Sequence, residues 1–153
     1  MSKYLVNGVE VKSKNRVVLE VVKQYIKQYP NISYNELKKI FNDELQGSIG
    51  VIKNESDMIR WESDGRKDNR DKRFFTNNQD ILKLNNENIY VCTEWGNSGT
   101  LHNFSNFIKY AEEELDFDIK NLDNENIKRY KTNDKKEKTE IKNKENKNNN
   151  NNI

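Results

Sequence analysis

NNENIYVCTEW, residues 85–95, is the stretch that predicts a β-sheet most directly. Its polar opening, 85–88, suits a turn between two strands, and a strand is expected over 89–95. Side chains alternate between the two faces of a strand. One face would therefore carry Ile89, Val91, Thr93 and Trp95, and the other Tyr90, Cys92 and Glu94. This mixture predicts a sheet that is covered on one side and half exposed on the other.

Other segments favour strands around this one. Residues 73–76 and 80–84 precede it and would form two neighbouring strands. Residues 47–53, GSIGVIK, would add a strand whose glycines permit a bulge. Near the N-terminus, residues 4–11 alternate loosely around Asn7-Gly8, a dipeptide suited to a tight hairpin turn. We therefore expect an antiparallel sheet of four or five strands.

Apolar spacing predicts a pair of helices ahead of the sheet. From Arg16 to Tyr29 the apolar residues follow the spacing of an amphipathic helix, although the many valines leave a strand as the alternative. Pro30 ends this helix because the residue before a proline disfavours helical geometry. Ser33 is the expected N-cap of the second helix, since Glu36 completes a capping box. The buried face of that helix would consist of Leu37, Ile40 and Phe41.

A third helix is expected after the break at 96–99, with Asn103 as its cap. Its apolar face would consist of Phe104, Phe107, Ile108, Ala111 and Leu115. Residues 117–119 would add an edge strand. The fold class that follows is α+β, with the helical pair and the C-terminal aromatic helix packed on one face of the sheet, in an arrangement that resembles a winged helix.

The chain changes character after Ile119. Hydrophobic residues make up 33% of the 153 residues and charged residues 34%, and apolar side chains are scarcest in 120–153. Such a segment cannot bury enough apolar surface to offset its ordering entropy. We therefore expect one globular domain over 1–119 and a disordered Lys/Asn-rich tail over 120–153.

The formal net charge of +2 is divided unequally between these two parts. The tail holds 10 Lys/Arg against 6 Asp/Glu, a net +4, and the remainder holds 17 against 19, a net −2. A net-acidic body argues against a domain whose whole surface binds the phosphate backbone of nucleic acid. The tail could still add weak, salt-sensitive attraction to nucleic acid or another polyanion.

Cysteine usage and hydropathy indicate a cytoplasmic protein. Cys92 is the single cysteine, which excludes an intrachain disulfide and a multi-thiolate zinc site. No run approaches the roughly 20 apolar residues that span a bilayer, and the opening residues lack the apolar core of a signal peptide. We expect no membrane association.

Side chains suited to catalysis are few. His102 is the single histidine and directly precedes a predicted helix cap, where a structural role is usual. Cys92 lies mid-strand, where a thiol behaves as a small apolar group. The segment 47–53 lacks the glycine spacing and the Lys-Ser or Lys-Thr of a phosphate-binding loop. Asp80 with Lys83, and Glu94, could hold Mg²⁺ as in a nuclease, but Asp-x-x-Lys is a common coincidence. We expect no metal and no cofactor.

A contact surface is more plausible in the segment 60–75. It combines basic and aromatic residues, a mixture used for phosphate contacts and base stacking, although four acidic residues are interleaved with them. The candidate contact residues are Arg60, Trp61, Arg66, Lys67, Arg70, Lys72, Arg73 and Phe75. Lys38 and Lys39 would join them from the outer face of the second helix, where a recognition helix presents its contacts.

Three strings carry a resemblance to a known kind of domain: YPNISYNELKKIFNDELQGSIGVI, RFFTNNQDILKLNNENIYVCTEWG and NFSNFIKYAEEELDFDI. Across 19–119 the chain resembles a small uncharacterised domain of bacteria and phages that occurs beside restriction and nuclease modules. The resemblance implies a setting of defence or counter-defence against mobile DNA. It assigns no activity and no functional residue.

Three functions follow from these patterns. The first is a non-enzymatic interaction module that binds nucleic acid, or a nucleic-acid-associated protein, through the 60–75 segment. The second is a small protein inhibitor or adaptor of a nuclease or another defence enzyme, consistent with the acidic body. The third, metal-dependent nuclease activity centred on Asp80, has the least support.

Overall fold

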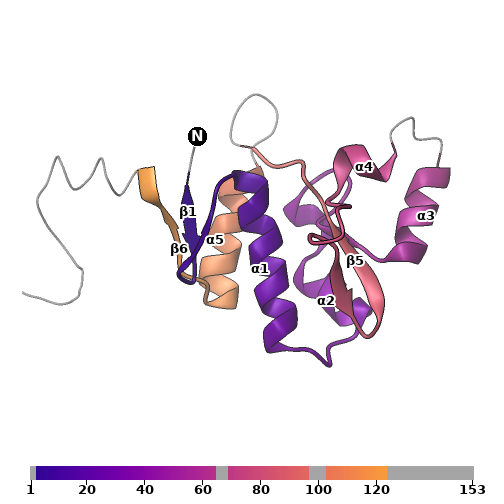
Figure 1. Cartoon of the computed structure of the whole chain (residues 1–153), viewed down its shortest axis with the longest axis horizontal. Coiled ribbons are helices and arrows are strands. Elements are labelled where there is room, and N and C mark those ends of the chain that lie inside the picture. Colours follow the sequence, from indigo (N-terminus) through magenta and orange to yellow (C-terminus); the bar gives the residue numbers. More distant parts are fainter. Residues whose placement is uncertain (1–2, 65–68, 97–102, 124–153) are drawn as a thin grey trace, which may run out of the picture. The chain divides into compact units, whose positions relative to one another are not determined.

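Figure 1 shows the chain as a computed structural model, which describes residues 3–64, 69–96 and 103–123. The chain divides into two units, 1–119 and 120–153. All the elements named below belong to the first unit except the end of the last strand. From residue 124 on, the predicted disordered tail lies outside the described residues, so its disorder stays a prediction.

The N-terminal hairpin forms as predicted. Strands β1 (Tyr4–Val6) and β2 (Val9–Val11) pair antiparallel, with Val6 opposite Val9. The turn residues Asn7 and Gly8 have φ of 48° and 86°, the left-handed geometry that an Asn-Gly hairpin turn requires. A third strand, β6 (Ile119–Asn121), follows β1 in the order β2-β1-β6.

A second sheet forms around residues 85–95. Its strands are β3 (Ile52–Lys53), β4 (Leu82–Leu84) and β5 (Glu87–Val91). Their order is β3-β5-β4, and both pairings are antiparallel. Asn85 and Asn86, at φ of 52° and 66°, make the tight β4–β5 turn. The predicted hairpin is thus confirmed, but its bounds differ: the turn is shorter than 85–88 because Glu87 and Asn88 already pair in β5, and regular pairing ends at Val91 instead of residue 95.

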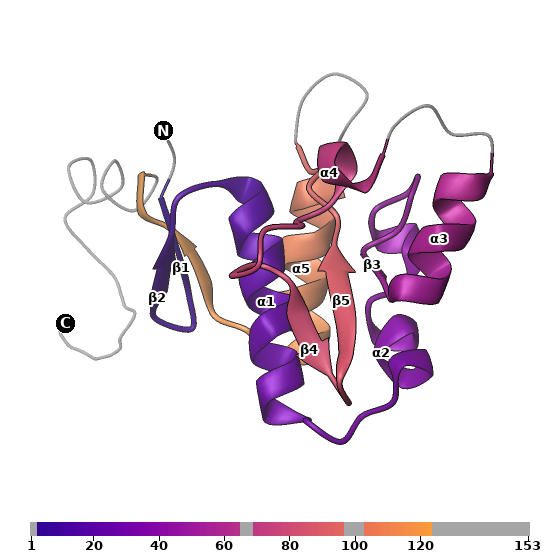
Figure 2. The same cartoon turned by 45° about the vertical axis from the view of Figure 1, so that its right-hand side comes forward.

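The prediction of one sheet with four or five strands is wrong, since the described residues form two three-stranded sheets. Helix α1 (Lys14–Gln28) packs against β1 and β2 on one side and β5 on the other, between the two sheets (Figure 2). Its buried residues span roughly 200° of the helix at 100° per residue, so two sides of it are covered. They are Val17, Val18, Leu19, Val21, Val22 and Ile26.

The predicted strand at 73–76 is also wrong. Residues 70–73 form a short helix, α4 (Arg70–Arg73), and Phe74 makes a single bridge to Cys92. The first residue of this helix, Arg70, forms ion pairs with Glu55 and Glu62, as described below. Upstream of it lie the 3₁₀ turn η1 (Asp43–Leu45) and helix α3 (Glu55–Ser63).

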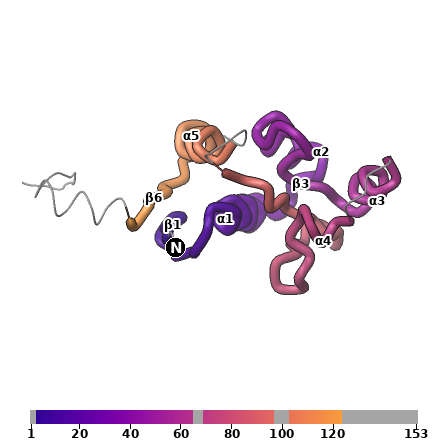
Figure 3. The backbone as a smooth tube through the Cα atoms, turned by 90° about the horizontal axis from the view of Figure 1, so that it is seen from above, coloured from indigo at the N-terminus to yellow at the C-terminus, as the bar shows by residue number. Residues whose placement is uncertain are grey.

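The capping box of the second helix is confirmed. The Glu36 backbone N–H donates to Ser33 Oγ at 3.1 Å, and the Ser33 N–H donates to Glu36 Oε1 at 3.1 Å, at the start of α2 (Tyr34–Ile40). The aromatic helix α5 (Asn103–Leu115) also forms, with Phe104, Phe107 and Ala111 buried. Seen from above, α1 lies between α5 and the β1 strand on one side and α2 and α3 on the other (Figure 3). No helix in the described ranges is long and apolar enough to cross a membrane.

Two apolar clusters cover the two faces of β5. The larger cluster contains Ile89 and Val91 of β5 together with buried side chains of α1, α2 and α5. The smaller one consists of Met58, Trp61, Phe74, Tyr90 and Cys92. The alternation predicted along the strand is therefore correct, but the half-exposed face is wrong. Helix α3 and Phe74 cover that face, which a strand's own sequence cannot reveal.

Candidate interaction surfaces

The aromatic residues of the predicted 60–75 contact region lie inside the protein. Trp61 is 8% exposed, Phe74 2% and Phe75 8%. Trp61 and Phe74 pack edge to face, with ring centroids 5.2 Å apart. Phe75 lies under the Arg16 guanidinium, 4.8 Å from the ring centroid. These rings are occupied by the core, so none of them presents a free face for stacking on a base.

Arg70 is bound within the protein. Its guanidinium donates to Glu62 at 2.8 and 3.0 Å, to Glu55 at 2.9 and 3.0 Å, and to the Tyr90 hydroxyl at 3.2 Å. The Tyr90 hydroxyl in turn donates to Glu55 at 2.7 Å. Hydrogen bonds from Arg70, more than any other effect, hold the pKa of both carboxyls below their usual range. Arg70 therefore joins α4 to α3 and β5.

Other predicted cations also have carboxylate partners. Arg60 pairs with Asp57 one helical turn away, and Arg73 pairs with Glu94 at 3.3 Å. Lys38 lies 3.5 Å from Asp57 and 3.4 Å from Asp43. Burial favours a higher pKa for Asp57, but the hydrogen bond from Tyr34 and the charges of Lys38 and Arg60 outweigh it and leave the pKa lowered.

The remaining predicted contact residues are divided between exposed positions and the undescribed part of the chain. Lys39 on α2 and Lys72 on α4 are exposed. Arg66 and Lys67 lie outside the described residues. The exposed cations among the described candidates are thus Arg60, Lys39 and Lys72, carried by three different helices. The other described candidates, Trp61, Arg70, Arg73, Phe75 and Lys38, make contacts within the protein.

Lys53 is a buried lysine that was not among the predicted site residues. Lys53 on β3 is 8% exposed, and its Nζ lies 5.9 Å from the centroid of the Phe74 ring. It pairs in register with Tyr90 and so faces the smaller cluster. Burial and then the charge of Lys38 lower its pKa. The sequence did hold one signal for this burial: Lys53 directly follows Val51 and Ile52, within a strand predicted to enter the core.

Residues 47–50, GSIG, form a loop whose backbone N–H groups bind the side chain of the preceding residue, Gln46. The Gln46 carboxamide oxygen accepts three successive backbone N–H groups, from Ser48, Ile49 and Gly50, at 2.7–3.1 Å. Its nitrogen donates to the Glu94 carbonyl at 3.1 Å. Converging N–H groups of this kind can hold an anion, but here Gln46 occupies them. The loop therefore has a structural role: through Gln46 it is connected to the backbone at Glu94.

Asn103 belongs to the same hydrogen-bond network, and its side chain does not act as the predicted cap of α5. Its carboxamide nitrogen donates to the carbonyls of Gln46 at 2.9 Å and Glu94 at 3.1 Å, and its oxygen accepts the Gly96 N–H at 3.0 Å. This network joins residues from all three strings that carry the resemblance: Gln46, Glu94 and Asn103. These residues thus serve the packing of the loop, the strand and the helix.

The residues considered for catalysis have structural roles where they are described. Cys92 is fully buried, and this burial raises the pKa of its thiol to about 12. Asp80 forms a two-point ion pair with Arg16 at 2.7 and 3.0 Å. Among the described residues no group of three His, Cys, Asp or Glu side chains could hold a metal ion. His102 lies outside the described residues.

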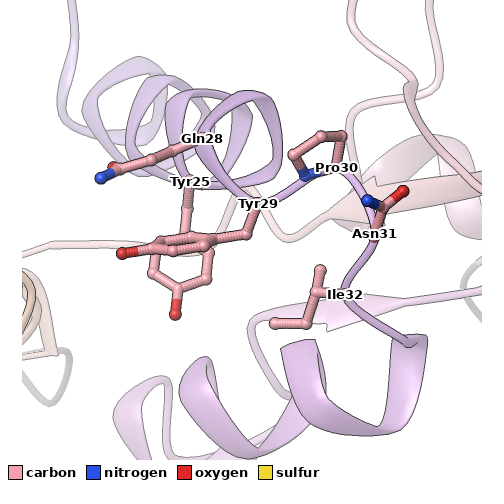
Figure 4. A pocket seen from close by; sticks show the side chains of 6 residues that line it. All are labelled: Tyr25, Gln28, Tyr29, Pro30, Asn31 and Ile32. Atoms are coloured by element: carbon pink, nitrogen blue, oxygen red, sulfur yellow. The ribbon is translucent and has the colours of Figure 1, made fainter.

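A pocket of about 340 Å³ lies at the α1–α2 connection, outside the predicted contact region (Figure 4). The two rings of Tyr25 and Tyr29 pack with centroids 4.7 Å apart at 46°, and Ile32 points toward them. Tyr29 is 46% exposed, an unusual value for a large aromatic residue in this chain. The residues that line the pocket are Tyr25, Gln28, Tyr29, Pro30, Asn31 and Ile32. We call this site the tyrosine pocket.

The polar groups of the tyrosine pocket lie at the protein surface, since Gln28, Tyr29 and Asn31 are exposed. Within the described residues, the hydroxyls of Tyr25 and Tyr29 and the carboxamides of Gln28 and Asn31 make no side-chain hydrogen bond. The sequence predicted an amphipathic helix that ends at Tyr29 and did not predict this site. The one available signal was the cluster of two tyrosines directly before a proline, at the end of a helix.

Comparisons with protein-family models, with curated proteins and with solved structures found no match to this chain. The resemblance to a domain of bacteria and phages stays a hypothesis. The function is therefore inferred from the surfaces described above.

Proposed function

We propose that this protein is a non-enzymatic interaction module that binds a protein partner at the tyrosine pocket. One observation carries the proposal: Tyr29 and its neighbours expose an apolar pocket whose polar groups have no partner among the described residues. Tyrosine is favoured at protein interfaces because it offers a large rigid surface with one polar end. The proline beside it fixes the backbone, so little ordering entropy is lost on binding.

The charge distribution supports a protein partner over nucleic acid. Arg60, Arg70 and Arg73 each pair with a carboxylate of the chain itself. A phosphate would have to compete with these contacts, and the residues 1–119 carry a net charge of −2. The aromatic rings of the same region are buried. The tyrosine pocket, by contrast, has no charged residue in its lining.

The nature of the partner follows from the resemblance and remains part of the proposal. A domain that occurs beside restriction and nuclease modules would act as an inhibitor or adaptor of a nucleic-acid-processing enzyme in the cytoplasm. Binding at a preformed surface suits this role because it requires no chemistry of the small protein itself. The partner would supply the catalytic residues and any metal ion.

Direct nucleic-acid binding is the second candidate. Three exposed cations favour it: Lys39 on α2, Arg60 on α3 and Lys72 on α4. A winged-helix mode would use α2 as the recognition helix, but that helix has seven residues and its Lys38 is already paired with Asp57. Phosphate contacts without stacking would give weak binding that is strongly reduced by salt.

A capture experiment with matched variants separates the two candidates. The tagged full-length protein is incubated with host lysate at low and physiological salt, and the captured protein and nucleic acid are both identified. We expect Tyr29→Ala to abolish capture of a specific protein, and the Lys39→Glu, Lys72→Glu double variant to retain it. Loss of capture in the charge variant alone, with nucleic acid in the eluate, would reverse the assignment.

A further inference from the structure

We propose that strand β2 (Val9–Val11) is a self-association edge, at which two copies of this chain pair antiparallel about a two-fold axis through Val11. In the strand order β2-β1-β6, β2 has a hydrogen-bonded neighbour on one side only. An edge strand presents unpaired backbone groups on which another strand can pair. The inference goes beyond the proposed function, because this edge shares no residue with the tyrosine pocket.

The β1–β2 hairpin determines which backbone groups of this edge point outward. Because its turn has two residues, the residues that flank the turn form the closing hydrogen-bonded pair, and such pairs then alternate along the ladder. Val9 and Val11 therefore direct their N–H and C=O groups toward β1, whereas those of Glu10 point away from it. Lys12 follows in the same outward phase. Within the described residues, neither Glu10 nor Lys12 takes part in a backbone hydrogen bond outside the hairpin.

The charges along this edge select one register. Glu10 and Lys12, two residues apart, are both exposed, and neither forms an ion pair with another described residue. When Val11 lies opposite Val11 of the second copy, Glu10 of each chain lies opposite Lys12 of the other, and these are also the hydrogen-bonded pairs. Opposite charges in directly opposed positions stabilise a sheet. The neighbouring register, centred on Glu10, opposes two glutamates and is unfavourable.

The apolar face of the edge provides a second, independent observation. Val9 pairs with Val6 and so lies on the same face of the sheet, yet Val9 is 44% exposed and Val6 is fully buried. The core covers this face at β1 and leaves it partly open at β2. In the register centred on Val11, Val9 of each copy lies diagonally across from Val11 of the other. Pairing therefore removes from water apolar surface that the single chain exposes.

Self-complementarity favours a second copy over any other strand. An unrelated strand would need a lysine and a glutamate at two matching positions, whereas a second copy supplies both through the two-fold symmetry of the contact. The edge strand β4 of the other sheet lacks this property. Its one charged residue is Lys83, whose ammonium group binds Asn88 of the same chain. β2 is therefore the edge that two copies can share.

The test combines charge reversal with mixing of the full-length variants. Sedimentation equilibrium at concentrations up to about 1 mM detects even weak dimers. Glu10→Lys opposes two lysines in each pair and Lys12→Glu opposes two glutamates, so each variant alone should associate about tenfold more weakly or less than that. An equimolar mixture of the two variants should dimerise again, because position 10 of one chain then meets the opposite charge at position 12 of the other.

Matched controls and a second measurement exclude indirect effects. Lys23→Glu on α1 and Glu113→Lys on α5 reverse exposed charges away from this edge and should associate as the original protein does. Thermal melts of all variants report whether the fold is retained. In the original protein, the Glu10 and Lys12 amides should exchange with solvent more slowly at high than at low protein concentration, because pairing gives them acceptors in the second copy.

Three results would overturn the inference. The first is an original protein that stays monomeric at the highest concentration, with exchange at the Glu10 amide independent of concentration. The second is a Lys12→Glu variant that associates as the original protein does, since position 12 then lies outside the contact. The third is a mixture of the two folded variants that stays monomeric. Partner capture by Tyr29→Ala is measured separately, so the proposed function and this inference can fail independently.

Discussion

Arg70 and Glu62 form a two-point ion pair: Nη2 of the arginine lies 2.8 Å from Oε1, and Nε lies 3.0 Å from Oε2. The same guanidinium reaches both oxygens of Glu55. A residue that sequence analysis assigned to a partner is thus the main link between α3 and α4.

Replacing Arg70 should destabilise the protein. We expect Arg70→Gln to lower the free energy of unfolding by about 2 kcal/mol, because hydrogen bonds to charged groups contribute about that much. Arg70→Lys should restore only part of the loss, since an ammonium group cannot make the two-point contact. Urea unfolding measures both. Lys72→Gln, an exposed neighbour on the same helix, should change stability by no more than about 0.5 kcal/mol, and an equal loss there would contradict the assigned role.

The pH dependence of stability should report the same pairs. The folded-state pKa values of Glu55 and Glu62 lie below the usual unfolded value of about 4.3. A lowered pKa contributes stability that is present above the unfolded value and is lost as pH falls through the folded value. The stability difference between the original protein and Arg70→Gln should therefore be full at pH 7 and shrink below about pH 4. A difference that is constant with pH would show that Arg70 acts through packing alone.

Gln46 should be among the least replaceable polar residues. Gln46→Met keeps the size but leaves three backbone N–H groups without this acceptor, among them the buried Gly50 N–H, and an unsatisfied buried group costs about 1–3 kcal/mol. The Glu94 carbonyl keeps its hydrogen bond from Asn103. We expect a loss of at least about 2 kcal/mol in urea unfolding, together with faster hydrogen exchange at the Gly50 amide. Ser48→Ala keeps the backbone donor of Ser48 and should be nearly neutral.

Local chemistry explains which parts of the fold the sequence predicts. The Ser33–Glu36 capping box and the Asn7-Gly8 turn depend on residues at most three apart, so both are visible in the sequence. The failed strand at 73–76 depends on Arg70 meeting Glu55, 15 residues away. Likewise, the covering of the Tyr90 face of β5 requires α3, whose contact with that strand no local pattern indicates.

The candidate site was harder to predict for the same reason. Trp61 and Phe74 have the composition of a stacking surface, but they pack against each other in the core. Tyr25 and Tyr29 follow the spacing of a buried stripe, yet Tyr29 lies one turn beyond the last residue that the sheets cover. Whether an aromatic ring is buried depends on where neighbouring elements end, and that information is not contained in spacing along one helix.

Gly50 and Gly47 offer a matched pair for separating backbone strain from a side-chain clash. Both have left-handed φ, 98° and 93°. A Cβ on Gly50 would come within 2.5 Å of Asp43 Oδ1, whereas a Cβ on Gly47 would meet nothing within 4 Å. Gly47→Ala should therefore lower the unfolding free energy by about 1–2 kcal/mol, the cost of a left-handed L-residue.

Gly50→Ala should cost slightly more than Gly47→Ala because the exposed Asp43 carboxylate must turn away from the new Cβ. Adding Asp43→Ala should remove the extra loss and leave the strain, so the double variant should approach the stability of Gly47→Ala. Asp43 is largely exposed and its pair with Lys38 at 3.4 Å contributes little, so Asp43→Ala alone serves as the reference. Equal costs for the two glycine variants, or no relief in the double variant, would place Asp43 away from the loop in solution.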